Sequence, residues 1–146
     1  MRLATVDDTK ALGRRLASHL RPGDLVVLSG PLGAGKTALT QGIGEGLGVE
    51  GRVTSPTFVI ARVHRGPVPL VHVDAYRMRD AGPVALDDLD LDEDIDSSVV
   101  VVEWGEGLVE QLSDSHVEIR LERHEDDSRT ATVEWVGPRW AAEQPF

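Results

Sequence analysis

The sequence contains no cysteine and no asparagine, and only two of its 146 residues, Lys10 and Lys36, are lysine. Without cysteine, the chain can form neither disulfides nor thiolate metal sites. Without asparagine, it cannot carry the Asn-Lys-x-Asp element by which ordinary GTPases recognise guanine. Disulfide scaffolds, thiolate metalloproteins and ordinary GTPases are therefore excluded.

Long apolar runs and excess positive charge are also missing. No stretch of 18 apolar residues occurs, and the first residues lack the apolar core of a signal peptide. We therefore expect a cytoplasmic protein without membrane contact. The formal net charge of −10 argues against tight, direct binding to a nucleic-acid backbone. At 146 residues and 40% hydrophobic content, one domain spanning 1–146 can bury a real core.

The most specific motif is Gly-Pro-Leu-Gly-Ala-Gly-Lys-Thr, from Gly30 to Thr37. It matches the phosphate-binding P-loop, and the apolar residues 25–28 before it predict a buried parallel strand. Glycines let backbone N–H groups surround a polyphosphate, and the N-terminus of the following helix attracts the anion. Lys36 would reach the terminal phosphates and the Thr37 hydroxyl would hold Mg²⁺. The alternative is a glycine-rich turn that binds no ligand.

The sequence thus predicts a nucleoside triphosphate, ATP rather than GTP, as the ligand. The residues expected to contact it lie in the P-loop and at two threonines elsewhere: Pro31, Leu32, Gly33, Ala34, Gly35, Lys36, Thr37, Ala38, Thr9 and Thr57.

Two helices are predicted around the motif. Thr5 and Asp8 form a capping box before an amphipathic helix over 5–20, whose start near Thr9 is a candidate neighbour of the base. The helix after the P-loop runs to about Gly48 and contains three further glycines. Each costs about 1 kcal/mol relative to alanine. Close approach of a neighbouring backbone would compensate for them, and a short helix stabilised by packing is the alternative.

A hydroxyl-rich segment, Thr54-Ser-Pro-Thr57, follows this helix. In P-loop proteins a loop at this place senses the γ-phosphate, so Thr57 is the expected sensor. A plain turn before a strand is the alternative reading.

Two carboxylates follow predicted strands. Residues 58–63 and 68–74 predict a hairpin whose second strand ends in Asp74, and Val99–Val102 predict a buried strand that ends at Glu103. Ligands gather at the carboxyl ends of parallel strands, so both acids are expected in the site as metal ligands and catalytic groups, together with Lys36. Which acid holds Mg²⁺, beside Thr37, and which positions the attacking water stays open. His72 is expected to be structural.

The last third of the chain predicts an antiparallel hairpin from alternating residues at 117–122 and 131–135, with no catalytic group. Residues 137–146 are expected to fray. Together these elements predict an α/β, P-loop NTPase-like domain: a mixed β-sheet flanked by helices, with a C-terminal β-hairpin.

Four stretches in this order resemble the TsaE family, which serves tRNA threonylcarbamoyladenosine (t6A) synthesis in bacteria. They are Gly30–Thr37, Thr54–Phe58, His72–Arg77 and Val102–Glu106. The resemblance implies a Mg²⁺-dependent ATPase that is weak alone and cycles a TsaD–TsaB-type complex acting on adenosine 37, so that tRNA is met only indirectly. It also implies that the second and third stretches are switches and that Glu103 and Trp104 complete the site.

Two other functions remain open at this point. A small-molecule P-loop kinase would need an acceptor pocket and usually an arginine-rich lid. A nucleotide-dependent adaptor would use the same carboxylates to hold Mg²⁺ without significant hydrolysis.

Overall fold

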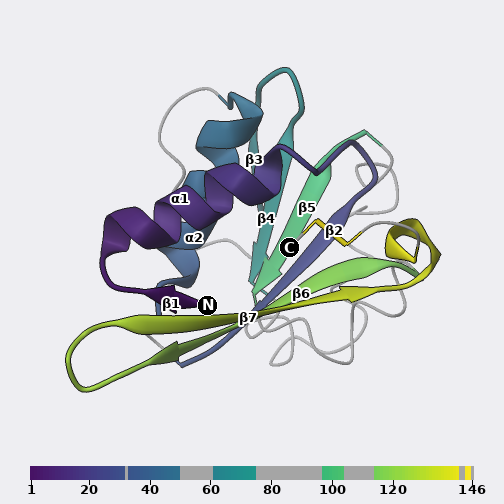
Figure 1. Ribbon diagram of the computed structural model, residues 1–146. Coiled ribbons are helices and arrows are strands. Elements are labelled where there is room, and N and C mark those ends of the chain that lie inside the picture. Colours follow the sequence, from purple (N-terminus) through teal and green to yellow (C-terminus); the bar gives the residue numbers. More distant parts are fainter. Residues whose placement is uncertain (32, 50–60, 75–96, 104–113, 142–143, 146) are drawn as a thin grey trace.

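The computed structural model describes residues 1–31, 33–49, 61–74, 97–103, 114–141 and 144–145. Two α-helices, seven strands and one short 3₁₀ helix make up this part of the chain, and Figure 1 shows their arrangement. In chain order the α-helices and strands are β1 (Arg2–Leu3), α1 (Val6–Ala17), β2 (Leu25–Ser29), α2 (Lys36–Leu47), β3 (Ala61–His64), β4 (Leu70–Asp74), β5 (Val99–Glu103), β6 (His116–Arg123) and β7 (Arg129–Val136). None of the helices described here is long and apolar enough to cross a membrane.

All seven strands form one mixed sheet in the order β1-β7-β6-β2-β5-β4-β3. The central strand β2 is parallel to both neighbours, β5 and β6, and β5 is also parallel to β4. The antiparallel pairs lie toward the edges, where β3 joins β4 and β7 joins β6 and β1. The predicted mixed α/β sheet with a C-terminal hairpin is confirmed, and the hairpin is part of the main sheet because β6 pairs with β2.

Both helices pack on one face of the sheet and close its main core (Figure 1). Leu12 and Leu16 of α1 and Leu39 and Ile43 of α2 are buried against alternate strand residues. Those strand residues include Val26, Leu28, Val99, Val101, Val117 and Ile119. A strand buried in this way needs apolar side chains throughout, and β2 is buried at all five positions.

The capping box at the start of α1 is present as predicted. The Asp8 backbone N–H donates to the Thr5 hydroxyl over 3.2 Å, and the Thr5 N–H donates to the Asp8 carboxylate over 3.1 Å. The helix ends at Ala17 rather than near residue 20, because His19 and Leu20 continue it only as tighter i−3 turns. Leu20 is nevertheless buried, as its spacing predicted.

The glycines of α2 face α1 at very short range. A Cβ on Gly42 would overlap the carbonyl oxygen of Lys10, and one on Gly46 would lie 2.5 Å from the Ala17 Cβ. The same holds from the other helix, since a Cβ on Gly13 of α1 would overlap the carbonyl oxygen of Leu39. The expected close backbone approach therefore exists, and it offsets the poor helix propensity of glycine.

The expectation of a frayed tail is wrong for residues 137–140. Pro138–Trp140 form a short 3₁₀ helix, and Trp140 is only 2% exposed, with its ring centroid 4.7 Å from that of Trp135. The Arg139 guanidinium lies 3.9 Å from the centre of the Trp140 ring and donates from Nε to the buried Asp24 carboxylate over 3.1 Å. Burial of a large aromatic ring outweighs the usual tendency of chain ends to be disordered.

Gly42→Ala tests the close helix contact. We expect it to destabilise the fold by about 1–3 kcal/mol through overpacking, although alanine is the better helix former by about 1 kcal/mol. Chemical denaturation measures the difference. Gly46→Ala is the matched control, since its nearest obstacle is a side chain: Ala17→Gly should partly rescue Gly46→Ala and should leave Gly42→Ala unimproved. A higher denaturation midpoint in Gly42→Ala would contradict the close approach.

Candidate functional site

The P-loop turn joins the central strand β2 to helix α2. Gly30, Gly33 and Gly35 have φ values of 144°, 81° and 105°, a region that residues with a Cβ rarely adopt. A Cβ on Gly30 would also lie 2.5 Å from the Leu121 carbonyl oxygen of β6. The turn therefore needs glycine at these positions for backbone conformation and, at Gly30, for space as well.

The N-terminus of α2 carries no negative group of its own. Gly35 is the N-cap residue, no side chain caps the helix, and no acidic residue lies in its first turn. The first N–H groups of an α-helix have no partner within the helix, and together with the positive end of the helix dipole they attract an anion. This arrangement fits the phosphates of a nucleotide.

Lys36, the first residue of α2, turns back over the loop. Its side chain is largely buried, and Nζ donates a hydrogen bond to the carbonyl oxygen of Gly30. This bond holds the ammonium group of Lys36 against the backbone of the loop. Thr37 and Ala38 follow on the half-buried first turn of the helix, while Ala34 is fully buried and anchors the turn through its N–H bond to Pro31.

Thr9 of α1, the predicted neighbour of the base, lies beside the loop. Its methyl carbon is 3.6 Å from the position that a Cβ on Gly35 would take. The Thr9 hydroxyl, however, donates to the Thr5 carbonyl over 3.4 Å, within its own helix. In the described geometry Thr9 therefore presents a methyl group, rather than a free hydroxyl, to the loop.

The two predicted acids end neighbouring strands. Asp74 of β4 pairs in register with Glu103 of β5, and Glu103 pairs with Leu28 of β2, two residues before Gly30. The Glu103 carboxylate is buried and lies 3.0 Å from Nε2 of His72. The Asp74 side chain, Leu32, Thr57 and Trp104 lie outside the described residues.

Two arginines at the hairpin tip also reach the P-loop, and sequence reasoning missed both. Arg129 donates from Nη2 to the Gly33 carbonyl oxygen over 3.1 Å, and a Cβ on Gly33 would lie 3.2 Å from Nη1 of Arg123. The alternation of the hairpin gave no indication of this contact. The signal lies in the register: β6 pairs with β2 up to Ser29 and then continues to Arg123, past the start of the loop.

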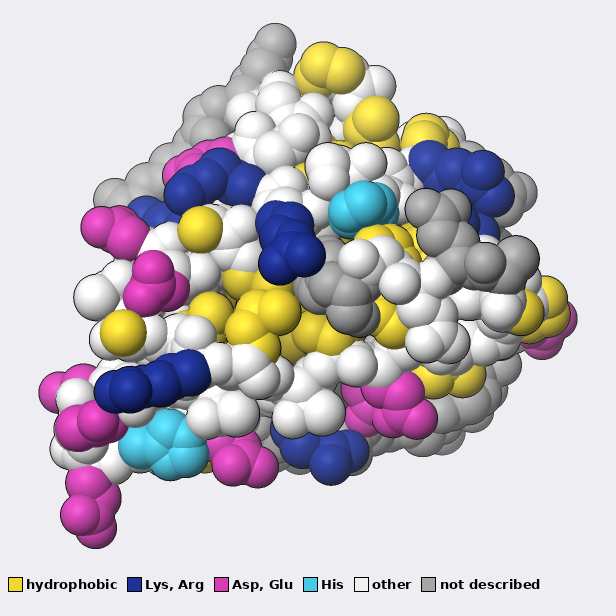
Figure 2. Space-filling model, viewed as in Figure 1, with side chains coloured by type: hydrophobic (Ala, Val, Ile, Leu, Met, Phe, Trp, Pro, Cys, Tyr) yellow, Lys and Arg dark blue, Asp and Glu magenta, His cyan; other side chains and the backbone are white. Residues whose placement is uncertain are grey.

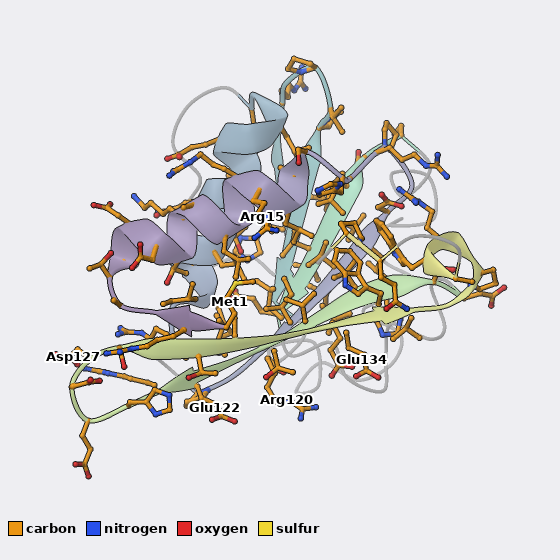
Figure 3. All side chains as sticks on the ribbon, viewed as in Figure 1. Met1, Arg15, Arg120, Glu122, Asp127 and Glu134 are labelled. Carbon is orange, nitrogen blue, oxygen red and sulfur yellow. The ribbon has the colours of Figure 1, made fainter. Side chains whose placement is uncertain are left out.

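Asp127 lies in the turn between β6 and β7, where Figure 3 labels it, and it accepts hydrogen bonds from both arginines. Its carboxylate accepts from Arg123 over 2.6 Å, and its carbonyl accepts from Arg129. The hydrogen bond and the positive charge of Arg123 hold the pKa of Asp127 below its usual range. A hydrogen bond from the Ser128 hydroxyl likewise lowers the pKa of the neighbouring Asp126. Both carboxylates therefore stay ionised at neutral pH, and the tip carries both signs of charge next to the P-loop.

Comparisons with known proteins identify the family of this chain. The family model described as "Threonylcarbamoyl adenosine biosynthesis protein TsaE" matches residues 3–131. A Streptomyces coelicolor protein named tRNA threonylcarbamoyladenosine biosynthesis protein TsaE is 59% identical, over 90% of this chain and 93% of its own length. The Bacillus subtilis protein of the same name is 41% identical, over 95% and 87%.

A solved structure shows the same fold. The crystal structure of Bacillus subtilis YdiB superposes with a TM-score of 0.77 at 37% sequence identity, covering 97% of this chain and 88% of that one. The resemblance seen in the four sequence stretches is thereby confirmed, and the chain belongs to the TsaE family of threonylcarbamoyladenosine biosynthesis proteins.

Proposed function

We propose that this protein binds ATP with Mg²⁺ at the P-loop and hydrolyses it slowly, and that this hydrolysis cycles a TsaD–TsaB-type complex during t6A modification of tRNA. Membership of the TsaE family supports the role in t6A biosynthesis. The observation that carries the ATPase proposal is the uncapped N-terminus of α2 behind three glycines with positive φ, with Lys36 folded over the loop.

The binding roles follow from chemistry that the loop already provides. Backbone N–H groups from Gly33 to Thr37 would hold the β- and γ-phosphates. The Ala34 N–H would give up its bond to Pro31 to do so, and Lys36 would exchange its bond to Gly30 for a phosphate oxygen. Arg129 adds a second cation at Gly33. The opposite charges of these groups and the polyphosphate favour binding in a site partly shielded from water.

Thr37 and Glu103 are the proposed ligands of Mg²⁺, which when bound would neutralise charge on the phosphate oxygens. Glu103 suits this role because, among the described residues, its Oε1 has no hydrogen-bond partner while Oε2 is held by His72. Asp74 ends the adjacent strand and is the proposed group that positions the attacking water, with Thr57 as the γ-phosphate sensor. Water attacks the γ-phosphorus, the bond to the bridging oxygen breaks, and ADP and phosphate leave.

The charge of the chain supports indirect contact with tRNA. The net charge is −10, and on the face shown in Figure 2 basic and acidic side chains are interspersed. A tight nucleic-acid binder would instead present a continuous basic surface. We therefore propose that the partner complex, and not this chain, makes the main tRNA contacts.

Lys36→Ala tests the binding site. We expect it to weaken binding of ATP and ADP by about a hundredfold or more, since it removes a charge-assisted bond worth about 3 kcal/mol. Calorimetric titration measures the affinity. Lys10→Ala is the matched control, because Lys10 is the other lysine of the chain, and this variant should bind like the wild type. Equal affinity of Lys36→Ala and the wild type would refute the role of Lys36.

Hydrolysis tests the function itself. The purified protein should release phosphate from ATP slowly, at a rate that rises on addition of a TsaD–TsaB pair and vanishes in Lys36→Ala. No arginine finger can be assigned from the sequence, so weak activity alone and stimulation by the partner pair are expected. ATP binding without hydrolysis in either setting would support the adaptor function instead, and phosphate transfer to a metabolite would support a kinase.

A further inference from the structure

His72 and Glu103 form a buried polar pair on adjacent strands next to the proposed site. His72 of β4 is fully buried, and its Nε2 lies 3.0 Å from Oε2 of Glu103, which is itself only 5% exposed. The two residues come from adjacent parallel strands, in which His72 pairs with Val101 and Asp74 pairs with Glu103. The His72 side chain thus extends toward the carboxyl end of β5, where Glu103 is the last residue of the strand.

Packing alone does not account for this histidine. Its neighbours along β4 are Leu70, Val71 and Val73, all buried and apolar, and an apolar residue at position 72 would continue the pattern. Burying a polar group without a hydrogen-bond partner destabilises the fold. In the described part of the molecule, Nδ1 has no hydrogen-bond partner, so the contact with Glu103 is what satisfies the ring.

The chemistry of the two groups determines which of them donates the hydrogen bond. An ionised carboxylate can only accept hydrogen bonds, so the ring nitrogen that faces it carries the proton. In the tautomer that carries its proton on Nε2, the ring donates to Glu103 and Nδ1 carries no proton. Donation to Oε2 restricts rotation of the carboxylate and leaves Oε1 free among the described residues.

We infer that His72 is a positioning residue: it orients Glu103 so that Oε1 can serve as a ligand of the divalent cation. Groups that orient metal ligands by hydrogen bonds commonly change metal affinity about ten- to hundredfold when they are removed. This inference rests on the proposed function, in which Glu103 holds Mg²⁺. It predicts that His72 affects the Mg²⁺-dependent part of nucleotide binding and no other part.

Three variants separate orientation from packing. His72→Gln keeps an N–H donor near the place of Nε2, His72→Asn is too short to keep it there, and His72→Leu fills the space without a donor. ADP affinity is measured by calorimetry with excess Mg²⁺ and again with EDTA, and each fold is checked by thermal unfolding. The ratio of the two affinities is the readout.

We expect His72→Leu and His72→Asn to lose about ten- to hundredfold of the Mg²⁺-dependent gain while keeping wild-type affinity in EDTA. His72→Gln should keep most of the gain. A wild-type gain in His72→Leu and His72→Asn would overturn the inference, as would equal losses in Mg²⁺ and EDTA in all three variants. Absence of ADP binding by the wild-type protein would instead refute the proposed function.

A second readout, which keeps His72 itself, covers the case in which the His72 variants do not fold. Nitrogen-15 NMR of the histidine-labelled wild-type protein without nucleotide should show one ring protonated on Nε2 whose shift moves in Glu103→Gln. A His72 ring protonated on Nδ1 alone, or one insensitive to Glu103→Gln, would contradict the orientation of Glu103 by His72.

Discussion

The site depends on one constraint, the backbone of the turn between β2 and α2. Gly30, Gly33 and Gly35 take conformations that place the free N-terminus of α2 directly behind the end of the central strand. Each surrounding element supports that turn. The β6 backbone abuts Gly30, α1 packs against α2 through glycine contacts, and Arg129 at the hairpin tip holds the Gly33 carbonyl. A local arrangement of N–H groups is therefore fixed by contacts from widely separated parts of the chain.

The sheet order explains why the chemistry collects at one edge. Strands β4, β5, β2 and β6 run parallel, so their carboxyl ends meet beside the P-loop. Glu103, the backbone of Asp74, Ser29 before the loop and Arg123 all lie at these ends. Residues from four strands thus supply the site, and the buried apolar residues 25–28 of β2 and 99–102 of β5 hold the register of these strands.

Much of this arrangement was predictable from local sequence. The capping box at Thr5, the buried strands before Gly30 and Glu103, and the close approach at Gly42 each follow from a short pattern with a direct physical cause. The other features depend on distant contacts. Arg129 contacts Gly33 only because β6 extends beyond the end of β2. Trp140 is ordered because it packs against Trp135. His72 contacts Glu103 only because β4 pairs with β5. The sequence of a single segment does not reveal how that segment pairs with distant strands.

We propose that the turn and the start of α2 hold the phosphates beyond the first. Calorimetric titration of the wild-type protein with AMP, ADP, ATP and pyrophosphate tests it most directly. ADP and ATP should bind, pyrophosphate should compete with them, and AMP should bind at least about a hundredfold more weakly, since it lacks the groups that the N–H donors and Lys36 would contact. Equal affinity for AMP and ADP, or no competition by pyrophosphate, would contradict the claim.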